Sequence, residues 1–128
     1  MNLLLDTHVL IWFFEGESKL SPPVRALIED ARNKCFVSIA SVWEITIKSS
    51  LGKLEFARSA KEISQLLYNN GISLLNIEIE HLDIMKSLPH HHRDPFDRLL
   101  IAQAISEGLS IISADRYFSP YPVKITWL

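Results

Sequence analysis

The chain has 128 residues, of which 48% are hydrophobic and 22% are charged, and its formal net charge is −2 at pH 7. This length suits one domain with one core, and the composition excludes a disordered tail and a disulfide-stapled miniprotein. The net charge excludes an overall positive field that would attract nucleic acid, so a polyanionic substrate would need a local basic patch or metal ions.

The N-terminal segment is untypical of a signal peptide, because Asp6 and His8 interrupt its apolar run and no basic segment precedes that run. No stretch reaches the roughly 18 apolar residues of a membrane span. The single cysteine, Cys35, lies in an apolar run, which favours a buried, reduced thiol. We therefore expect a cytoplasmic protein with no membrane association.

Five short apolar runs, at residues 3–5, 35–38, 72–77, 109–112 and 123–127, are typical of buried parallel strands. Helical patterns lie between them. Ser21 before Pro22 predicts one helix start, and Ser59 with Glu62 predicts a capping box at another. A strong helix is predicted over residues 95–107, ended by Gly108. The alternation predicts one α/β domain over residues 1–128, with a five-stranded parallel sheet between layers of helices.

Four acidic residues lie where the predicted strands end. Asp6 closes the first strand, Glu44 follows the second, Asp97 lies in the first turn of the 95–107 helix, and Asp115 follows the fourth strand. Ligands of open parallel sheets bind beyond the carboxyl ends of the strands, near the point where the strand order reverses. We therefore expect these four side chains to share one cleft.

Each acid also has a structural interpretation. Asp6 can cap the helix that follows it, Glu44 can complete a capping box begun by Ser41, Asp94 can cap the helix that starts at Pro95, and Asp115 can form a turn. Asp97 fits a first-turn acid favoured by the helix dipole. Taken one at a time, the structural roles are favoured.

Taken together, the four acids favour a metal site. Carboxylates that crowd together repel one another, and burial raises the cost of charging them. Mg²⁺ or Mn²⁺ relieves this cost, since these ions prefer oxygen ligands and retain bound water. Such a site is suited to phosphodiester hydrolysis by one ion or by two.

Four motifs carry a resemblance to a known family: LLLDTH at residues 3–8, SVWEI at 41–45, RDPFDRLLIAQA at 93–104 and SAD at 113–115. In this order they resemble the PIN-domain toxins called VapC, over nearly the whole chain. The block at 93–104 is the most specific of the four. The resemblance implies a five-stranded parallel sheet, an acidic Mg²⁺ or Mn²⁺ pocket, endonucleolytic cleavage of RNA, and a role as the toxin of a type II toxin–antitoxin pair.

The resemblance also assigns residues. The catalytic and metal-binding acids are Asp6, Glu44, Asp97 and Asp115, and the supporting residues are Thr7, Asp94 and Ser113. Basic residues near the motif ends are candidates for contact with RNA phosphates, although solvated surface charge explains each of them equally well. They are Lys48, Arg93, Arg98 and Arg116. The expected partners are RNA, a small VapB-like antitoxin and a second copy of the chain in a homodimer or an assembly of dimers.

Residues 9–14 motivate the dimer, because this early helix is too apolar to be covered on both faces by so short a chain. Within it, residues 12–14 are interpreted as core or subunit contacts rather than as a base-stacking surface. The three histidines at 90–92 are interpreted as a solvated loop rather than a zinc site, since adjacent histidines do not easily converge on one ion.

Three other classes stay open. A phosphatase or phosphoryl-transfer domain commonly needs a second aspartate two residues after the first, where this chain has His8. A receiver-type signalling domain needs paired acids after the first strand and a late lysine, whereas Asp6 is alone and the late motif carries Asp115. The third class is a non-catalytic nucleic-acid-binding module of PIN-like fold, which only an activity assay excludes.

Overall fold

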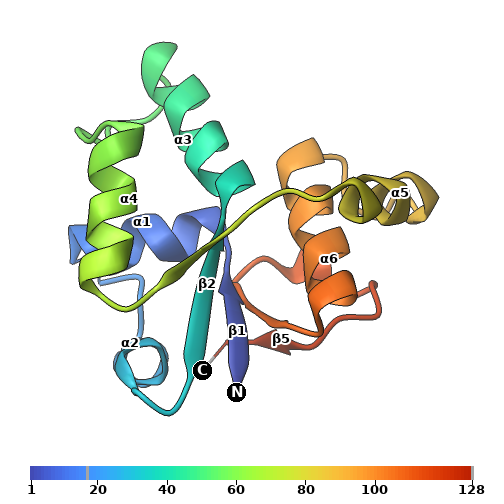
Figure 1. Cartoon of the computed structure of the whole chain (residues 1–128), viewed down its shortest axis with the longest axis horizontal. Helices are drawn as coiled ribbons and strands as arrows, with labels where there is room; N and C mark the ends of the chain where they lie inside the picture. The colour runs from blue at the N-terminus through green and yellow to red at the C-terminus, as the bar shows by residue number, and fades with distance from the viewer. Residues whose placement is uncertain (17, 128) are drawn as a thin grey trace.

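The structure is a computed structural model that describes residues 1–16 and 18–127 (Figure 1). Its centre is a five-stranded parallel sheet with the order β3-β2-β1-β4-β5. The strands are β1 (Asn2–Leu5), β2 (Lys34–Ser38), β3 (Ser73–Leu75), β4 (Ser110–Ile112) and β5 (Ile125–Thr126). The predicted parallel sheet is confirmed, although β3 and β5 are shorter than their apolar runs.

Helices cover both faces of this sheet (Figure 1). They are α1 (Thr7–Glu15), α2 (Pro22–Glu29), α3 (Ile39–Ser50), α4 (Ala60–Asn69), α5 (Ile79–Ser87) and α6 (Pro95–Glu107), followed by a single 3₁₀ turn, η1 (Arg116–Phe118). Leu3 and Leu5 face the core formed with α1 to α4, whereas Leu4 faces the core formed with α5 and α6. Because both faces are covered, the strands are apolar on both sides.

Most helix ends follow the local signals of the sequence. The Ser21 side chain caps α2, Ser59 and Glu62 form the predicted capping box of α4, and Gly108 ends α6 with a left-handed φ of 67°. The start of α3 differs from the prediction. Ser38, and not Ser41, is the N-cap, so Ser41 lies inside the helix and its hydroxyl is available for other contacts.

The early helix α1 is better covered than predicted. Val9 and Leu10 are buried, and the four residues at 11–14 are half-buried and pack against the first core. The large hydrophobic side chains with most exposure lie outside α1, among them Trp43 of α3 and Leu51, which directly follows α3. Cys35 is buried, as expected. Within the described residues, no helix has the length and apolar character to cross a membrane.

The sheet order places the switch point beside β1. The chain builds β1, β2 and β3 toward one edge and then returns to add β4 and β5 on the other side of β1. Leu5 of β1 pairs with Ile112 of β4, and the Asp6 N–H donates to the Ile112 carbonyl at 3.1 Å. Residues that follow β1 and β4 are therefore neighbours, as the topology rule predicts.

Candidate active site

Asp6 is fixed by the end of β1 and the start of α1. Its Oδ1 accepts the Val9 N–H at 2.8 Å as the N-cap of α1, and its Oδ2 accepts a hydrogen bond from the Ser113 hydroxyl. The residue is only 4% exposed. Burial raises the pKa of Asp6 despite these two hydrogen bonds, which act in the opposite direction.

Glu44 is held by groups from two helices. Its Oε1 lies 2.8 Å from the Thr7 hydroxyl, which is itself 3.0 Å from the Ser41 hydroxyl. Because the carboxylate can only accept, the single Thr7 proton is directed to Glu44 and Ser41 supplies the proton of the second contact. Lys48, one turn further along α3, donates to Glu44 Oε2 at 2.6 Å, and this bond raises the pKa of Lys48. Both oxygens of Glu44 are thus oriented.

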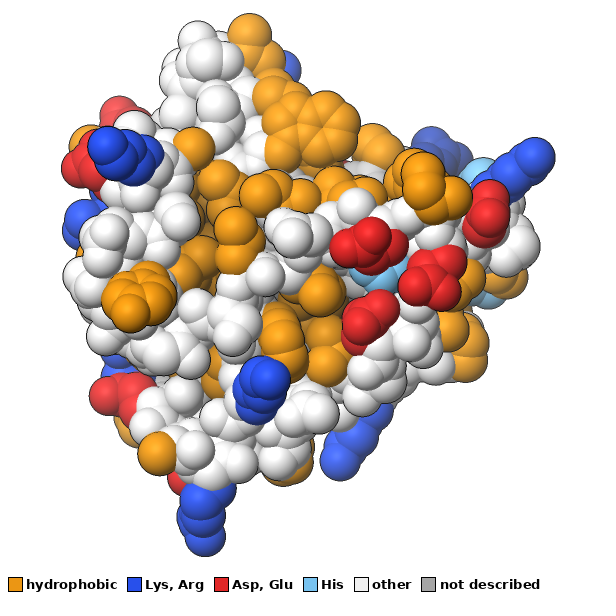
Figure 2. Space-filling model, in the orientation of Figure 1, with side chains coloured by type: hydrophobic (Ala, Val, Ile, Leu, Met, Phe, Trp, Pro, Cys, Tyr) orange, Lys and Arg blue, Asp and Glu red, His pale blue; other side chains and the backbone are white. Residues whose placement is uncertain are grey.

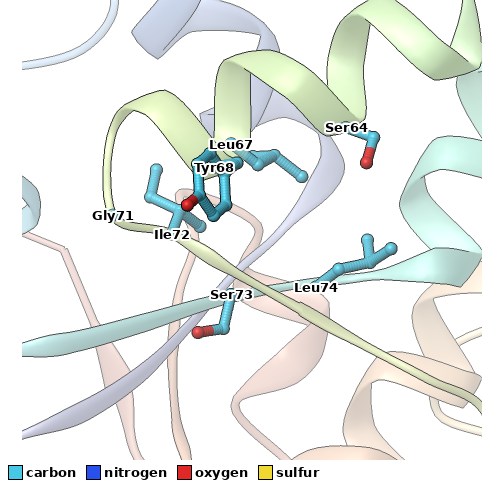
Figure 3. A pocket seen from close by; sticks show the side chains of 7 residues that line it. All are labelled: Ser64, Leu67, Tyr68, Gly71, Ile72, Ser73 and Leu74. Carbon is cyan, nitrogen blue, oxygen red and sulfur yellow. The ribbon is translucent and has the colours of Figure 1, made fainter.

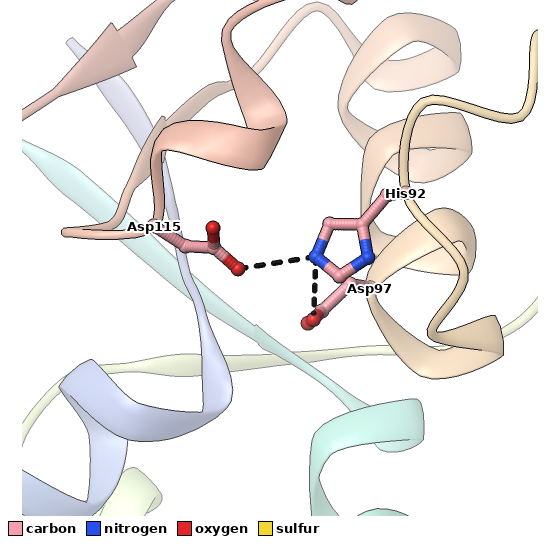
Figure 4. A group of neighbouring side chains, drawn as sticks. All are labelled: His92, Asp97 and Asp115. Carbon is pink, nitrogen blue, oxygen red and sulfur yellow. Dashed lines mark hydrogen bonds and ion pairs between the residues drawn. The ribbon is translucent and has the colours of Figure 1, made fainter.

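Asp97 and Asp115 meet at a histidine (Figure 4). The Nε2 atom of His92 lies 3.1 Å from Oδ2 of Asp97 and 3.1 Å from Oδ2 of Asp115. Asp97 comes from the first turn of α6, whereas Asp115 follows β4 and caps η1 through the Tyr117 N–H. One ring nitrogen therefore joins two acids from different elements.

The electrostatics of Asp97 show that the acids share one centre. Its pKa is raised from 3.8 to about 8, first by burial and then by the charges of Asp94, Glu44, Asp6 and Asp115. Repulsion from four other carboxylates requires all of them to be near. The predicted convergence of the acids is therefore present in the structure, and Figure 2 shows acidic side chains gathered around a histidine on this face.

The supporting residues lie at the same centre. Asp94 is the N-cap of α6, because its Oδ1 accepts the N–H groups of Phe96 at 2.8 Å and Asp97 at 3.4 Å. Ser113 links two acids, since its hydroxyl donates to Asp6 and accepts the Asp115 N–H at 2.9 Å. Asp94 thus caps a helix at this centre, and Ser113 orients two of its acids.

The basic candidates do not all lie where predicted. Lys48 contacts Glu44, and Arg93 and Arg116 are exposed on segments next to the acids. Arg98 is only 6% exposed, and its guanidinium donates to the carbonyls of Met85, Leu88 and Pro89 at 2.8–3.3 Å. The prediction of an RNA contact at Arg98 is corrected, because its donors satisfy carbonyls at the C-terminal end of α5.

Sequence reasoning missed His92. The sequence predicts a solvated loop for His90, His91 and His92, but the His92 side chain is only 11% exposed and reaches two predicted ligands. The contact to Asp115 spans 23 positions of the chain, so no local pattern reveals it. The only available signal is that His92 directly precedes the most specific motif.

Two hollows border the acidic centre. One of about 560 Å³ is lined by residues 90–94 and Tyr117, and another of about 300 Å³ is lined by Asp6, His8, Trp12, Ala114 and Asp115. A third hollow, of about 430 Å³, lies between α4 and β3 (Figure 3). Among the described residues that line it, none carries a carboxylate, an imidazole or a basic group, so this hollow offers no chemistry for a metal or phosphate site.

The donor set fits a hard divalent cation. Asp6, Glu44, Asp97 and Asp115 offer carboxylate oxygens, and the raised pKa of Asp97 shows a local excess of negative charge that a cation would neutralise. His92 already directs a ring nitrogen at two of these carboxylates. The fold and the site together define an α/β domain with a cluster of carboxylates, suited to bind a divalent cation, at the switch point of its sheet.

Comparison with known proteins gives the family. The PIN-domain profile matches residues 3–124, and the chain belongs to the PIN-domain family. PIN domains are in general divalent-metal-dependent nucleases. No curated protein sequence is significantly similar to the chain.

Solved structures share the fold at low sequence identity. A chain of VapBC2 from Rickettsia felis bound to a promoter DNA fragment is 12% identical, with a TM-score of 0.72 and coverage of 98% of both chains. A chain of a toxin–antitoxin complex from Klebsiella pneumoniae is 16% identical, with a TM-score of 0.68 and coverage of 98% of this chain and 96% of that one. A chain of FitAcB from Neisseria gonorrhoeae is also 16% identical, with a TM-score of 0.65 and the same coverage.

Proposed function

We propose that the chain is a Mg²⁺- or Mn²⁺-dependent endoribonuclease that acts as the toxin of a type II toxin–antitoxin pair in the cytoplasm. The observation that carries the proposal is the convergence of carboxylates on Asp97, whose pKa they and its burial raise to about 8. A protein maintains such repulsion where a functional ligand compensates it. Membership of the PIN-domain family supports a nuclease, and the toxin-like fold supports the biological role.

The side chains have distinct duties in this proposal. Asp6, Glu44, Asp97 and Asp115 would hold the cation, while Ser113, Thr7 and Lys48 keep Asp6 and Glu44 in fixed orientations. When bound, the divalent cation activates water for attack on phosphorus and neutralises charge on the phosphate. Fixed ligands reduce the reorganisation needed when substrate arrives.

Asp6 is a poor nucleophile in this geometry. Both its oxygens accept hydrogen bonds, from the Val9 N–H and the Ser113 hydroxyl, and the side chain is buried. The residue two positions later, His8, is exposed and is not an acid. The arrangement therefore supports hydrolysis at a metal centre over a phosphoenzyme mechanism of the phosphatase type.

The RNA would approach along the segments that carry exposed basic side chains. Arg93 and Arg116 flank the acids, and Arg93 also lines the larger hollow with Tyr117. Lys48 is 39% exposed and lies close enough to Asp94 and Asp97 for their charges to raise its pKa further. These three residues would neutralise backbone phosphates, which position RNA without reading its bases.

The proposed protein partner is a small antitoxin encoded nearby. An acidic centre attracts arginine or lysine, and exposed Trp43, which packs against Phe96 at 5.1 Å between ring centroids, adds an apolar contact next to it. Co-expression with the adjacent gene should give a complex that co-purifies and relieves toxicity. If the chain alone is harmless to its host and no adjacent gene product co-purifies, the toxin role is wrong.

We also propose a homodimer or an assembly of dimers. Helix α1 is largely covered within the chain, but Trp43 of α3 and Leu51, which directly follows α3, leave apolar surface exposed, at 54% and 61% exposure. Light scattering at micromolar concentration tests this proposal directly. A mass near 14.6 kDa would contradict it.

The central experiment is an RNA cleavage assay with purified chain. We expect cleavage with Mg²⁺ or Mn²⁺, loss of cleavage with EDTA, and recovery when excess metal is restored. Asp6→Asn is the matched control, because asparagine still caps α1 but removes a charged metal ligand. Cleavage that persists in EDTA, or equal cleavage by Asp6→Asn, would refute the proposed function.

A further inference from the structure

We propose that His92 is a positioning residue that orients two metal ligands, Asp97 and Asp115, through a proton on Nε2, and that it does not ligate the metal itself. This inference rests on the proposed function and adds a residue that the sequence motifs did not assign. Its basis is the hydrogen-bond pattern on both sides of the imidazole ring.

The first side of the ring fixes the position of its proton. The Asp94 N–H donates to Nδ1 of His92 at 3.2 Å. A nitrogen that accepts a hydrogen bond carries a lone pair, so the ring proton is on Nε2. The Nε2–H group then points at Asp115 Oδ2, and Asp97 Oδ2 lies at the same distance of 3.1 Å. A protonated Nε2 donates to carboxylates and has no lone pair for a cation.

The second line of evidence is that the ring is locked in place. The His92 N–H donates to the Tyr121 hydroxyl at 2.8 Å, and that hydroxyl donates to the Pro89 carbonyl at 2.7 Å. The ring packs against Phe118 and Tyr117, with centroids 5.5 and 5.7 Å away. A solvated loop residue would have none of these restraints, so the imidazole presents its N–H in one direction.

This arrangement has a direct consequence for metal binding. Asp115 accepts from His92 Nε2 at Oδ2 and from the Tyr117 N–H at Oδ1, so both of its oxygens are oriented, and each keeps a second lone pair that can face a cation. Asp97 Oδ2 lies 3.1 Å from the same nitrogen, which leaves Asp97 Oδ1 for the cation. A hydrogen-bond donor behind a ligand orients it, and loss of such a donor typically weakens metal binding about 10- to 100-fold. The same donor holds Asp97 and Asp115 together against their mutual repulsion.

The test compares Mn²⁺ affinity, measured by calorimetry, in wild-type protein and three variants. We expect His92→Ala to bind Mn²⁺ about 10-fold more weakly. His92→Gln should recover most of the affinity, since its amide offers an N–H at a similar distance. His90→Ala should behave as wild type, because His90 is an exposed residue of the same loop.

Imidazole ¹⁵N NMR separates a positioning role from a ligand role. His81 is an internal reference, since its Nδ1 accepts the Glu78 N–H and its Nε2 contacts Glu107 at 3.0 Å. We expect both His81 and His92 to carry the proton on Nε2, without metal and with Mg²⁺. A His92 whose Nε2 is unprotonated in the Mg²⁺ form overturns the inference, as does an unchanged affinity of His92→Ala. Failure of the wild-type protein to bind Mn²⁺ would instead refute the proposed function, and this inference with it.

Discussion

Replacing Asp97 with asparagine should stabilise the metal-free protein while it abolishes cleavage. The pKa of Asp97 is raised from 3.8 to about 8, so the folded state disfavours its ionised form at pH 7. Each pH unit between the unfolded-state pKa and pH 7 is worth about 1.4 kcal/mol, and roughly three such units separate them. Asp97 therefore lowers the free energy of unfolding at pH 7 by up to about 4 kcal/mol. Asparagine cannot ionise, and it keeps an oxygen that can accept from His92.

We expect Asp97→Asn to recover at least about 1 kcal/mol of this cost, which corresponds to a rise in melting temperature of about 4 °C for a domain of this size. Metal-dependent RNA cleavage should fall by orders of magnitude, because a charged ligand is lost. Thermal melts in EDTA and cleavage assays in Mn²⁺ provide the two measurements.

Asp94→Asn is the matched control, three residues away in the same motif. Asp94 caps α6 through the N–H groups of Phe96 and Asp97, and asparagine caps about equally well. Its melting temperature should change little, and much of its activity should remain. Wild-type cleavage by Asp97→Asn would refute the ligand assignment, and a folded but inactive Asp94→Asn would transfer that role to Asp94. A melting temperature of Asp97→Asn several degrees below wild type would refute the repulsion argument.

Three further predictions concern stability and packing. The metal-free wild-type protein should lose stability as pH rises from about 4 to 8, because the raised pKa of Asp97 makes the folded state hold more protons than the unfolded state in this window. Thermal melts across this range should show a shallower decline in stability for Asp97→Asn. A wild-type stability that rises toward pH 8 would contradict the argument. Arg98→Met should lower the free energy of unfolding in urea by at least about 2 kcal/mol, since three carbonyls around the C-terminal end of α5 lose a charged donor. The affinity for Mn²⁺ should be unchanged. A neutral effect on stability would reject the structural role of Arg98. Cys35 should react with a thiol reagent only slowly until urea is added, because burial both shields the thiol and raises its pKa. Immediate reaction in the folded protein would show that the Cys35 thiol is accessible to solvent.

The sequence predicted best those features that local chemistry determines. Helix α6 has the predicted bounds, because Asp94 caps it, Pro95 fits its first turn and Gly108 ends it in a left-handed conformation. The strands β3 and β5 are shorter than their apolar runs. Both are edge strands with a partner on one side only, so hydrophobicity extends beyond the hydrogen-bonded ladder.

The site was predictable to the extent that topology brings strand ends together. Asp6 and Asp115 could be placed in one cleft because they follow strands that the switch-point rule makes neighbours. His92 and Arg98 could not be assigned in this way, since their roles depend on carbonyls and carboxylates distant in the sequence. At Ser41 a tertiary contact overrode a local capping pattern, because Ser38 already caps α3 and the Ser41 hydroxyl contacts Thr7.

The most direct test of the central claim is the origin of the oxygen added to the product. If the acidic centre positions a cation that activates water, cleavage of a defined RNA in ¹⁸O-labelled water with Mn²⁺ should place one ¹⁸O atom on each newly formed terminal phosphate, as read by mass spectrometry. The early products should contain no cyclic phosphate. Unlabelled products that end in a 2′,3′-cyclic phosphate would show attack by the RNA's own 2′-hydroxyl, and would contradict hydrolysis at this centre.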